Sequence, residues 1–349
     1  MYDLYRQGLV VDDGLLLVVS QAPPFPSYHY HLAPLATTPT PPPPQALTSN
    51  THFHHFPTVP QMSATTALLH PLLTAFRTST PAFGAWLTLP GFLAARTAAA
   101  ASPHLSWVVI DCEHGATALQ PGAAESVHAI AGLGPAAPST IVRIPATGAC
   151  ADGSAGWQIK YVLDAGAKGV LVPMVSTAAQ AASVVAAARF PPEGVRGFGN
   201  PFTQLAWGPA GSVSAADYLA RANASVLVLV QIETRAAVEN LDDILSVDGL
   251  DGVFIGPYDL SLSLGFPAPA PDPHPEVETV IQRILAASHA KGKKCAIYCT
   301  SGAQSARRAK EGFDMINVTS DSGAMAESIA RNLAEAAGDA GQGAKGFSY

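Results

Sequence analysis

The stretch VLVLVQIE, residues 226–233, decides how the rest of the chain is interpreted. Its first five residues are valine or leucine, which is typical of a strand buried on both faces in a parallel sheet. The run then ends in Gln231 and Glu233, which are two positions apart and therefore point to the same side of a strand. Burying an amide and a carboxylate costs free energy unless their oxygen atoms are needed. The stretch predicts a core strand whose carboxyl end carries a polar site.

Seven other short apolar runs resemble this one, and they alternate with alanine-rich segments typical of helices. The expected strands are 83–89, 107–111, 141–145, 169–175, 226–233, 252–257, 295–300 and 315–321, and the expected helices include 158–166, 178–190, 235–247, 277–292 and 302–312. Several of these helices end at glycine, a common stop signal. Eight strands in about 270 residues predict a closed (β/α)8 TIM barrel. A doubly wound open sheet is the alternative, but no glycine-rich dinucleotide turn follows the first strand.

Residues 1–61 differ in composition from the rest of the chain. They contain PPFP at 23–26, TTPTPPPP at 37–44 and HFHHFP at 52–57. Proline at this density disfavours helices and central strands and favours extended, solvated chain. We therefore expect a disordered Pro-rich extension over 1–61 and a barrel domain over 62–345.

Charge and hydropathy limit the partners and the compartment. With 19 Lys and Arg against 26 Asp and Glu, the formal net charge is -7, which argues against nucleic acid as a partner. No apolar run approaches the roughly 20 residues that cross a bilayer, so no membrane partner is expected. Four scattered cysteines do not form a disulfide framework, and the N-terminus fits neither a secretory signal nor a transit peptide. The expected localisation is cytoplasmic.

Polar side chains gather where the expected strands end, which is where barrels of this class keep their sites. Five such residues accompany Gln231 and Glu233, namely Asp111, His114, Arg143, Tyr258 and Asp259. Because the carboxyl ends of parallel strands share one rim of a barrel, we expect these side chains to lie together.

Each candidate has a chemical interpretation and a structural alternative. Glu233 and Asp259 would supply oxygen ligands to a hard divalent cation, although Glu233 could instead cap the helix that begins near Thr234. A guanidinium at the position of Arg143 favours an anion. His114 is either a proton carrier or a side chain bonded to a loop.

Several segments together resemble one protein family. WVVIDCEHGA (107–116), IVRIP (141–145), the long segments 169–200 and 228–266, and HPEV (274–277) strongly resemble the HpcH/HpaI aldolase/citrate lyase family. The likeness is greatest to its 4-hydroxy-2-oxoheptanedioate (2,4-dihydroxyhept-2-ene-1,7-dioate) aldolase branch. It extends from residue 80 to residue 325.

The resemblance implies a class II aldolase that cleaves a 4-hydroxy-2-oxoacid reversibly to pyruvate and an aldehyde. It implies a divalent cation (Mg²⁺, Mn²⁺ or Co²⁺) and a homo-oligomer, a trimer or a hexamer. The implied roles are metal binding by Glu233 and Asp259, proton transfer by His114, transition-state stabilisation by Arg143, tuning of the histidine by Asp164, and substrate contacts by Gln231, Tyr258 and Asp259.

Two alternative functions stay open. One is a CoA-thioester lyase of the citrate-lyase type, which needs a basic cradle for the CoA phosphates. The other is a non-catalytic barrel that binds an oxoacid. The chain also departs from the family pattern at 146–157, at Tyr258 and at 317–325, which bears on the aldehyde that it accepts.

Overall fold

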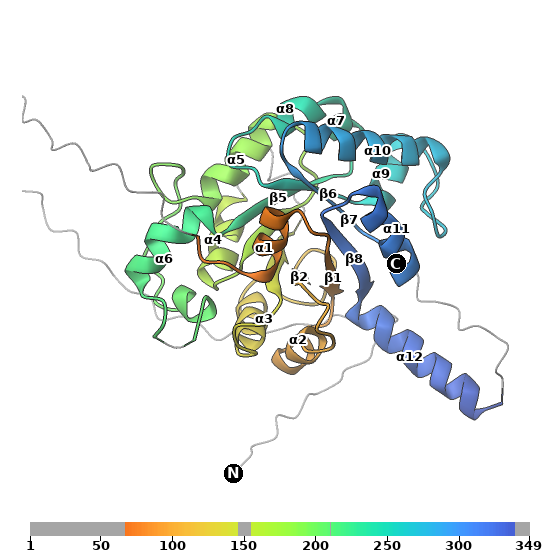
Figure 1. Cartoon of the computed structure of the whole chain (residues 1–349), viewed down its shortest axis with the longest axis horizontal. Coiled ribbons are helices and arrows are strands. Elements are labelled where there is room, and N and C mark those ends of the chain that lie inside the picture. Colours follow the sequence, from red (N-terminus) through yellow and green to blue (C-terminus); the bar gives the residue numbers. More distant parts are fainter. Residues whose placement is uncertain (1–66, 146–154, 210, 339–349) are drawn as a thin grey trace, which may run out of the picture. The chain divides into compact units, whose positions relative to one another are not determined.

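The computed structural model describes residues 67–145, 155–209 and 211–338, and Figure 1 shows their arrangement. Eight strands pair in parallel and in sequence order around a closed barrel. They are β1 (Ala82–Leu87), β2 (Trp107–Asp111), β3 (Ser139–Arg143), β4 (Gly169–Val172), β5 (Leu227–Ile232), β6 (Gly252–Ile255), β7 (Lys294–Ile297) and β8 (Met315–Ser320). The predicted (β/α)8 barrel is confirmed. The extension expected over 1–61 lies outside the described residues.

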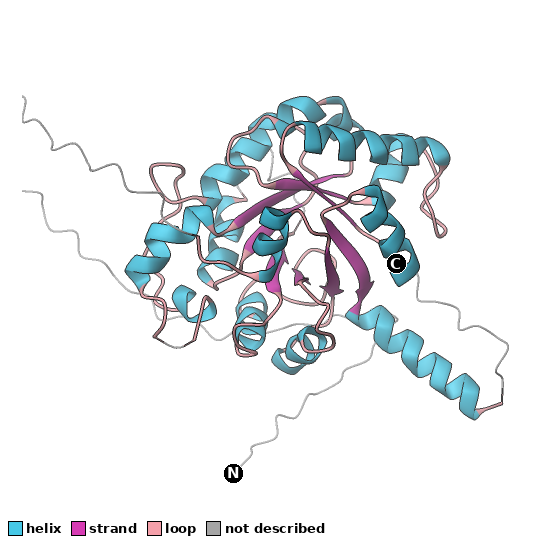
Figure 2. Cartoon of the chain, in the orientation of Figure 1, coloured by secondary structure: helices cyan, strands magenta, loops and turns pink. Residues whose placement is uncertain are grey.

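Helices surround the barrel, and Figure 2 shows the strands enclosed by them. They are α1 (Pro71–Thr78), α2 (Phe92–Ala99), α3 (Gly122–Ala131), α4 (Gly156–Asp164), α5 (Ala178–Ala188), α6 (Ala215–Arg221), α7 (Arg235–Glu239), α8 (Leu241–Leu245), α9 (Pro257–Leu264), α10 (Pro275–Ala290), α11 (Gly302–Glu311) and α12 (Asp321–Ala336). Two 3-10 turns, η2 (Thr203–Ala206) and η3 (Ala222–Ala224), lie before β5. Among the described helices, none is long and apolar enough to cross a membrane.

One helix prediction was wrong. The segment 235–247 forms two short helices, α7 and α8, which meet at Asn240. The side-chain amide of Asn240 donates to the carbonyl of Ser176 at 2.9 Å. This tertiary bond occurs at a residue type that often competes with helical hydrogen bonding, so the apolar period alone did not reveal the break.

The core has an inner and an outer layer. The outer layer packs strands against helices, whereas the inner layer fills the barrel with residues that include Trp86, Trp107, Val109, Ile141, Leu171, Leu229, Phe254 and Met315. Gly84 makes room for one of the two tryptophans, since a Cβ there would lie 2.1 Å from the Trp107 ring. Helix α1 contributes Leu72 and Phe76 to the inner layer and closes the amino-terminal end. The opposite end is left for a site.

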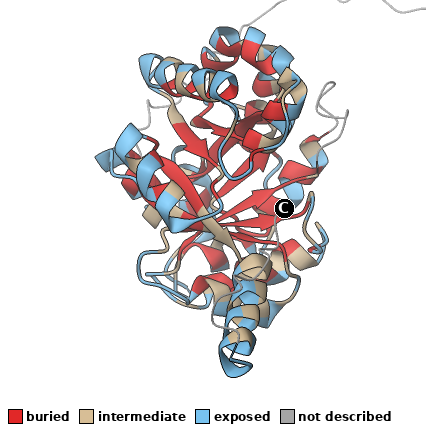
Figure 3. Ribbon diagram, turned by 90° about the vertical axis from the view of Figure 1, so that its right-hand side faces the viewer, coloured by how far each residue is buried: buried red, intermediate tan, exposed pale blue. Residues whose placement is uncertain are grey.

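Helix α12 differs from the other helices. It follows β8 directly, extends away from the barrel in Figure 1, and contains no buried residue. In Figure 3 the strands are buried, whereas exposed residues predominate on the outer helices. The first turn of α12 is tied to the barrel through Asp321, which accepts hydrogen bonds from the backbone N–H groups of Thr88 and Leu89.

Candidate active site

A cavity of about 600 Å³ opens at the carboxyl end of the barrel. It brings together most of the predicted site residues, namely His114, Arg143, Gln231, Glu233, Tyr258 and Asp259. They lie at or just after the carboxyl ends of β2, β3, β5 and β6. Tyr258 and Asp259, which follow β6, lie in the first turn of α9. The prediction that these side chains share one rim is confirmed.

Arg143 is held rigidly in this cavity. It is 7% exposed and lies level with Asp111 in the register of β2 and β3. Its Nε donates to Asp111 Oδ1 at 2.9 Å and its Nη2 donates to Oδ2 at 2.7 Å, a two-pronged ion pair. Burial disfavours the charged guanidinium, but Asp111 outweighs that effect and raises the pKa of Arg143. The arginine is therefore charged and fixed in direction.

Glu233 is buried at the end of β5 and makes two hydrogen bonds. Its Oε1 accepts from the backbone N–H of Met174 and its Oε2 from the side-chain amide of Gln231, both at 2.7 Å. The alternative that Glu233 caps the next helix is excluded, because the Thr234 side chain accepts from the N–H of Ala237. Glu233 instead faces the cavity.

The cavity carries an excess of negative charge. Asp111 and Glu113 pair with the guanidinium of Arg143, whose Nη1 lies 2.9 Å from Glu113 Oε2, and Glu233 and Asp259 line the same cavity. Burial raises the pKa of Glu233 to about 8, and the charges of Asp259 and Glu113 add to this increase. Burial likewise raises the pKa of Glu113, against the charge of Arg143. Such crowding of carboxylates is relieved by a bound cation.

The donor set suits a hard divalent cation. Glu233 and Asp259 line the same cavity and offer oxygen ligands, and few protein ligands plus water and substrate are how Mg²⁺ is commonly held. A group of three or more His, Cys, Asp or Glu side chains placed around one ion is absent from the described residues. Gly256 leaves the space that Glu233 occupies, since a Cβ there would lie 2.5 Å from Glu233 Oε2.

His114 lies at the cavity rim. Its side chain is 54% exposed, and its Nε2 lies 3.7 Å from Glu113 Oε1. Its backbone N–H donates to Asp111 Oδ1 at 3.3 Å, which ties the loop after β2 to the same carboxylate that holds Arg143. The imidazole is therefore accessible to a ligand in the cavity.

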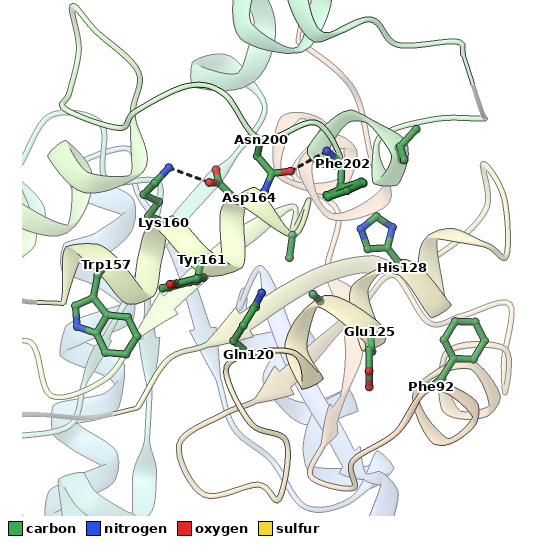
Figure 4. Close-up of a pocket in the computed structure, with 13 residues that line it drawn as sticks. Phe92, Gln120, Glu125, His128, Trp157, Lys160, Tyr161, Asp164, Asn200 and Phe202 are labelled. Atoms are coloured by element: carbon green, nitrogen blue, oxygen red, sulfur yellow. Dashed lines mark hydrogen bonds and ion pairs between the residues drawn. The ribbon is translucent and has the colours of Figure 1, made fainter. Parts of the chain in front are cut away.

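Asp164 does not join these residues within one chain, so the expected contact with His114 is not found. It is the last residue of α4, and its carboxylate accepts from Lys160 at 2.9 Å and from Arg196 at 3.1 Å. Figure 4 shows it in a separate cavity between helices, with Tyr161 and His128. The reason is topological, because a helix that follows a strand returns toward the opposite end of the barrel.

Other lining residues were missed by the sequence analysis, namely Trp86, Thr88, Phe254, Tyr298 and Ser322. The Trp86 ring lies 5.3 Å from both Phe254 and Tyr298 and 4.9 Å from the guanidinium carbon of Arg143. Its indole N–H donates to Asp111 Oδ2 at 3.1 Å. These aromatic residues alternate along their strands with outward-facing residues. In the sequence they cannot be distinguished from other core residues, because only the closed barrel shows that they face the cavity.

The fold and the site define a class and then a family. A closed parallel barrel that collects carboxylates, an arginine and a histidine at its carboxyl end has the architecture of (β/α)8-barrel enzymes. The model of the family described as HpcH/HpaI aldolase/citrate lyase matches residues 84–328. The chain belongs to the HpcH/HpaI aldolase/citrate lyase family.

Relatives and solved structures agree with this membership. The chain is 35% identical to a hydroxypyruvate/pyruvate aldolase of Rhizorhabdus wittichii over 75% of this chain and 97% of that protein. It is 36% identical to a 2-keto-3-deoxy-L-rhamnonate aldolase of Klebsiella pneumoniae over 76% of this chain and 92% of the relative. A solved family member from Burkholderia cenocepacia is 30% identical, with a TM-score of 0.67 over 77% of this chain and all of that chain. The aldolase names support a lyase activity.

Proposed function

We propose that this protein is a divalent-metal-dependent (class II) pyruvate aldolase. It would cleave a 4-hydroxy-2-oxoacid reversibly to pyruvate and an aldehyde. The observation that carries the proposal is the pair of carboxyl groups of Glu233 and Asp259 in the cavity at the barrel mouth, where burial and the charge of Asp259 raise the pKa of Glu233 to about 8, because a bound cation would stabilise the ionised form of this buried group. Relatives named as pyruvate and 2-keto-3-deoxy-L-rhamnonate aldolases support the reaction class.

Glu233 and Asp259 would hold the cation, which would be Mg²⁺, Mn²⁺ or Co²⁺. When bound, it supplies Lewis-acid polarisation of the oxoacid oxygen atoms. Gln231 has a positioning role, since its amide donates to Glu233 Oε2 at 2.7 Å and its Oε1 accepts from Arg143 at 3.4 Å. The amide thus connects the carboxylate that binds the ion to the guanidinium. Tyr258 flanks Asp259 and would contact the substrate.

The remaining residues move a proton and stabilise charge. His114 would accept the proton of the C4 hydroxyl, directly or through water, as the C3–C4 bond breaks. The electrons of that bond pass to the pyruvate fragment as an enolate, and the aldehyde is released. Arg143 would stabilise the negative oxygen that develops, and its fixed position lowers the reorganisation needed. No lysine lines the described cavity, so no Schiff base is invoked.

The direct test is pyruvate release from a 4-hydroxy-2-oxoacid with Mg²⁺, Mn²⁺ or Co²⁺ added, repeated after EDTA. We expect release that chelation abolishes and that added metal restores. Glu233→Gln should reduce turnover by about 1000-fold, because it removes the charge of one of the two carboxylates proposed to bind the metal. Release that survives chelation, or a Glu233→Gln variant with wild-type turnover, would contradict the proposal.

The two alternatives fit the cavity less well. Among the described lining residues, Arg143 is the one lysine or arginine, and a single guanidinium is too few to bind the several phosphate groups of CoA. A non-catalytic oxoacid-binding barrel is distinguished by pyruvate proton exchange. With metal in D₂O, the proposed enzyme should exchange the methyl protons of pyruvate faster than the buffer does, whereas a binding protein should not.

We also propose that the protein forms a homo-oligomer, either a trimer or a hexamer. Helix α12 exposes Met325, Ile329 and Leu333 at a spacing that places them on one face. An apolar groove of about 820 Å³ lies along β1 and the carboxyl-terminal half of β8 and is lined by residues that include Leu93, Ala98, Leu105 and Val318. A second copy could cover both surfaces. Ile329→Glu should lower the mass measured by light scattering, while Glu327→Gln, on another face, should not.

A further inference from the structure

The wall of the cavity formed by β1 and β8 contains a chain of hydroxyl groups. Thr88 follows the last residue of β1, and Ser322 is the second residue of α12, immediately after β8. Their hydroxyl oxygens lie 2.8 Å apart, and both side chains line the cavity. Thr88 Oγ1 also donates to Asp321 Oδ1 at 2.9 Å. The hydrogen-bonded chain therefore runs from the Asp321 carboxylate through the Thr88 hydroxyl to the Ser322 hydroxyl, which faces the cavity.

The direction of these hydrogen bonds follows from proton counting. A threonine hydroxyl has one proton, and the bond to the Asp321 carboxylate is the stronger use of it. The proton between Thr88 and Ser322 must then come from Ser322. Ser322 Oγ consequently presents lone pairs, and no proton, to the cavity. A ligand group at this position must be a hydrogen-bond donor, such as a hydroxyl. A carboxylate has no proton to donate and does not bind here.

The charges at this wall lead to the same conclusion. Asp321 lies one hydroxyl away and is held by the N–H groups of Thr88, Leu89 and Ser322. Arg143, the one lysine or arginine among the described lining residues, is bonded to Asp111 and Glu113. A second carboxylate on the substrate would meet no lysine or arginine among the described residues of β1 and β8 that line the cavity, and it would be repelled by Asp321.

This wall lies opposite the proposed metal ligands. In a closed ring of eight strands, β1 is four strands from β5, which ends beside Glu233 (Figure 1). Between the two walls, the rings of Trp86, Phe254 and Tyr298 form an apolar surface. An oxoacid held at Glu233 and Asp259 would extend its aldehyde part across these rings toward Ser322.

We propose that Thr88 and Ser322 form an acceptor subsite that selects an uncharged hydroxyaldehyde over an aldehyde ending in a carboxylate. This inference rests on the proposed aldolase function and specifies its substrate class. It departs from the dicarboxylate, 4-hydroxy-2-oxoheptanedioate, that the sequence resemblance implied. In this subsite Ser322 contacts the aldehyde, whereas Thr88 is a positioning residue that orients the serine.

The test measures kcat/KM for aldol addition of pyruvate to three aldehydes with saturating metal. They are glyceraldehyde, 2-methylbutyraldehyde, which has the same shape with methyl groups for hydroxyls, and succinic semialdehyde. We expect the wild type to prefer glyceraldehyde to each of the others by at least 10-fold or so. Ser322→Ala should reduce the preference for glyceraldehyde over 2-methylbutyraldehyde about 10-fold, the value of one lost hydrogen bond.

Two matched variants complete the design. Ser322→Thr keeps the hydroxyl and should retain the preference, and Ser328→Ala, on α12 but outside the cavity, should retain it as well. A wild type that prefers succinic semialdehyde, or a Ser322→Ala variant with an unchanged preference, overturns this inference. Pyruvate proton exchange by the wild type in D₂O separates this result from a failure of the proposed function. Exchange without the preference refutes only the subsite, whereas absence of exchange with every metal refutes both.

Discussion

Gly256→Ala should disable the site without unfolding the barrel. Gly256 lies at the end of β6 with φ -96° and ψ 92°, a conformation that alanine adopts readily. Its new Cβ would lie 2.5 Å from Glu233 Oε2 and 3.3 Å from Gln231 Nε2. Because the nearest atom is the end of a side chain, the carboxylate moves and the backbone does not. A displacement of roughly 1 Å in a positioned group costs about 100-fold in rate.

Two measurements check this result. Mn²⁺ binding by calorimetry should weaken, and pyruvate release should fall about 100-fold, while the thermal unfolding midpoint stays close to that of the wild type. Gly302→Ala is the matched control, because a Cβ at the start of α11 meets no atom within 4 Å. If Gly256→Ala bound Mn²⁺ and turned over like the control, Glu233 would not be a ligand whose placement matters.

Three other predictions test neighbouring groups. His114→Ala should slow turnover by about 100-fold or more while Mn²⁺ still binds, and loss of the metal would refute its assignment as a proton carrier. Asp111→Asn should lower the free energy of unfolding by about 3–5 kcal/mol in urea titrations, because it breaks the buried pair with Arg143; an unchanged stability would show that the pair is dispensable. Burial lowers the pKa of His70 from 6.5 to about 3, so folding favours the neutral ring and stability falls as the pH drops below 6.5. At pH 5, 1.5 units below 6.5, the loss should be about 2 kcal/mol, and His70→Asn should show a flatter pH profile; an equal slope in both proteins would contradict this origin.

Much of the site followed from local pattern. Gln231 and Glu233 share one side of a strand because side chains alternate, and that rule holds wherever the strand lies. Their position at a strand end predicted the cavity in which Arg143 and Asp259 were later found. The break at Asn240 was missed because its cause is a bond to Ser176, 64 residues away in the chain.

Pairings between side chains on different strands could not be predicted from the sequence. Asp111 and Arg143 are each conspicuous at a strand end, but the register of β2 and β3 is what sets them level. Asp164 is the opposite case. The family resemblance suggested that it contacts His114, but in the structure it lies at the end of α4 and pairs with Lys160 and Arg196. A helix return of this kind is fixed by topology and not by the residues near Asp164.

The sequence by itself determined the alternation of strands and helices along the chain and the polar ends of the strands, because these depend on periodicities of a few residues. Closure of the barrel decided the rest. It brings Thr88 to Asp321 across 233 positions of the chain and creates the hydroxyl wall opposite Glu233. Contacts of such separation depend on how eight strands tilt and meet, and a local pattern carries no record of that geometry.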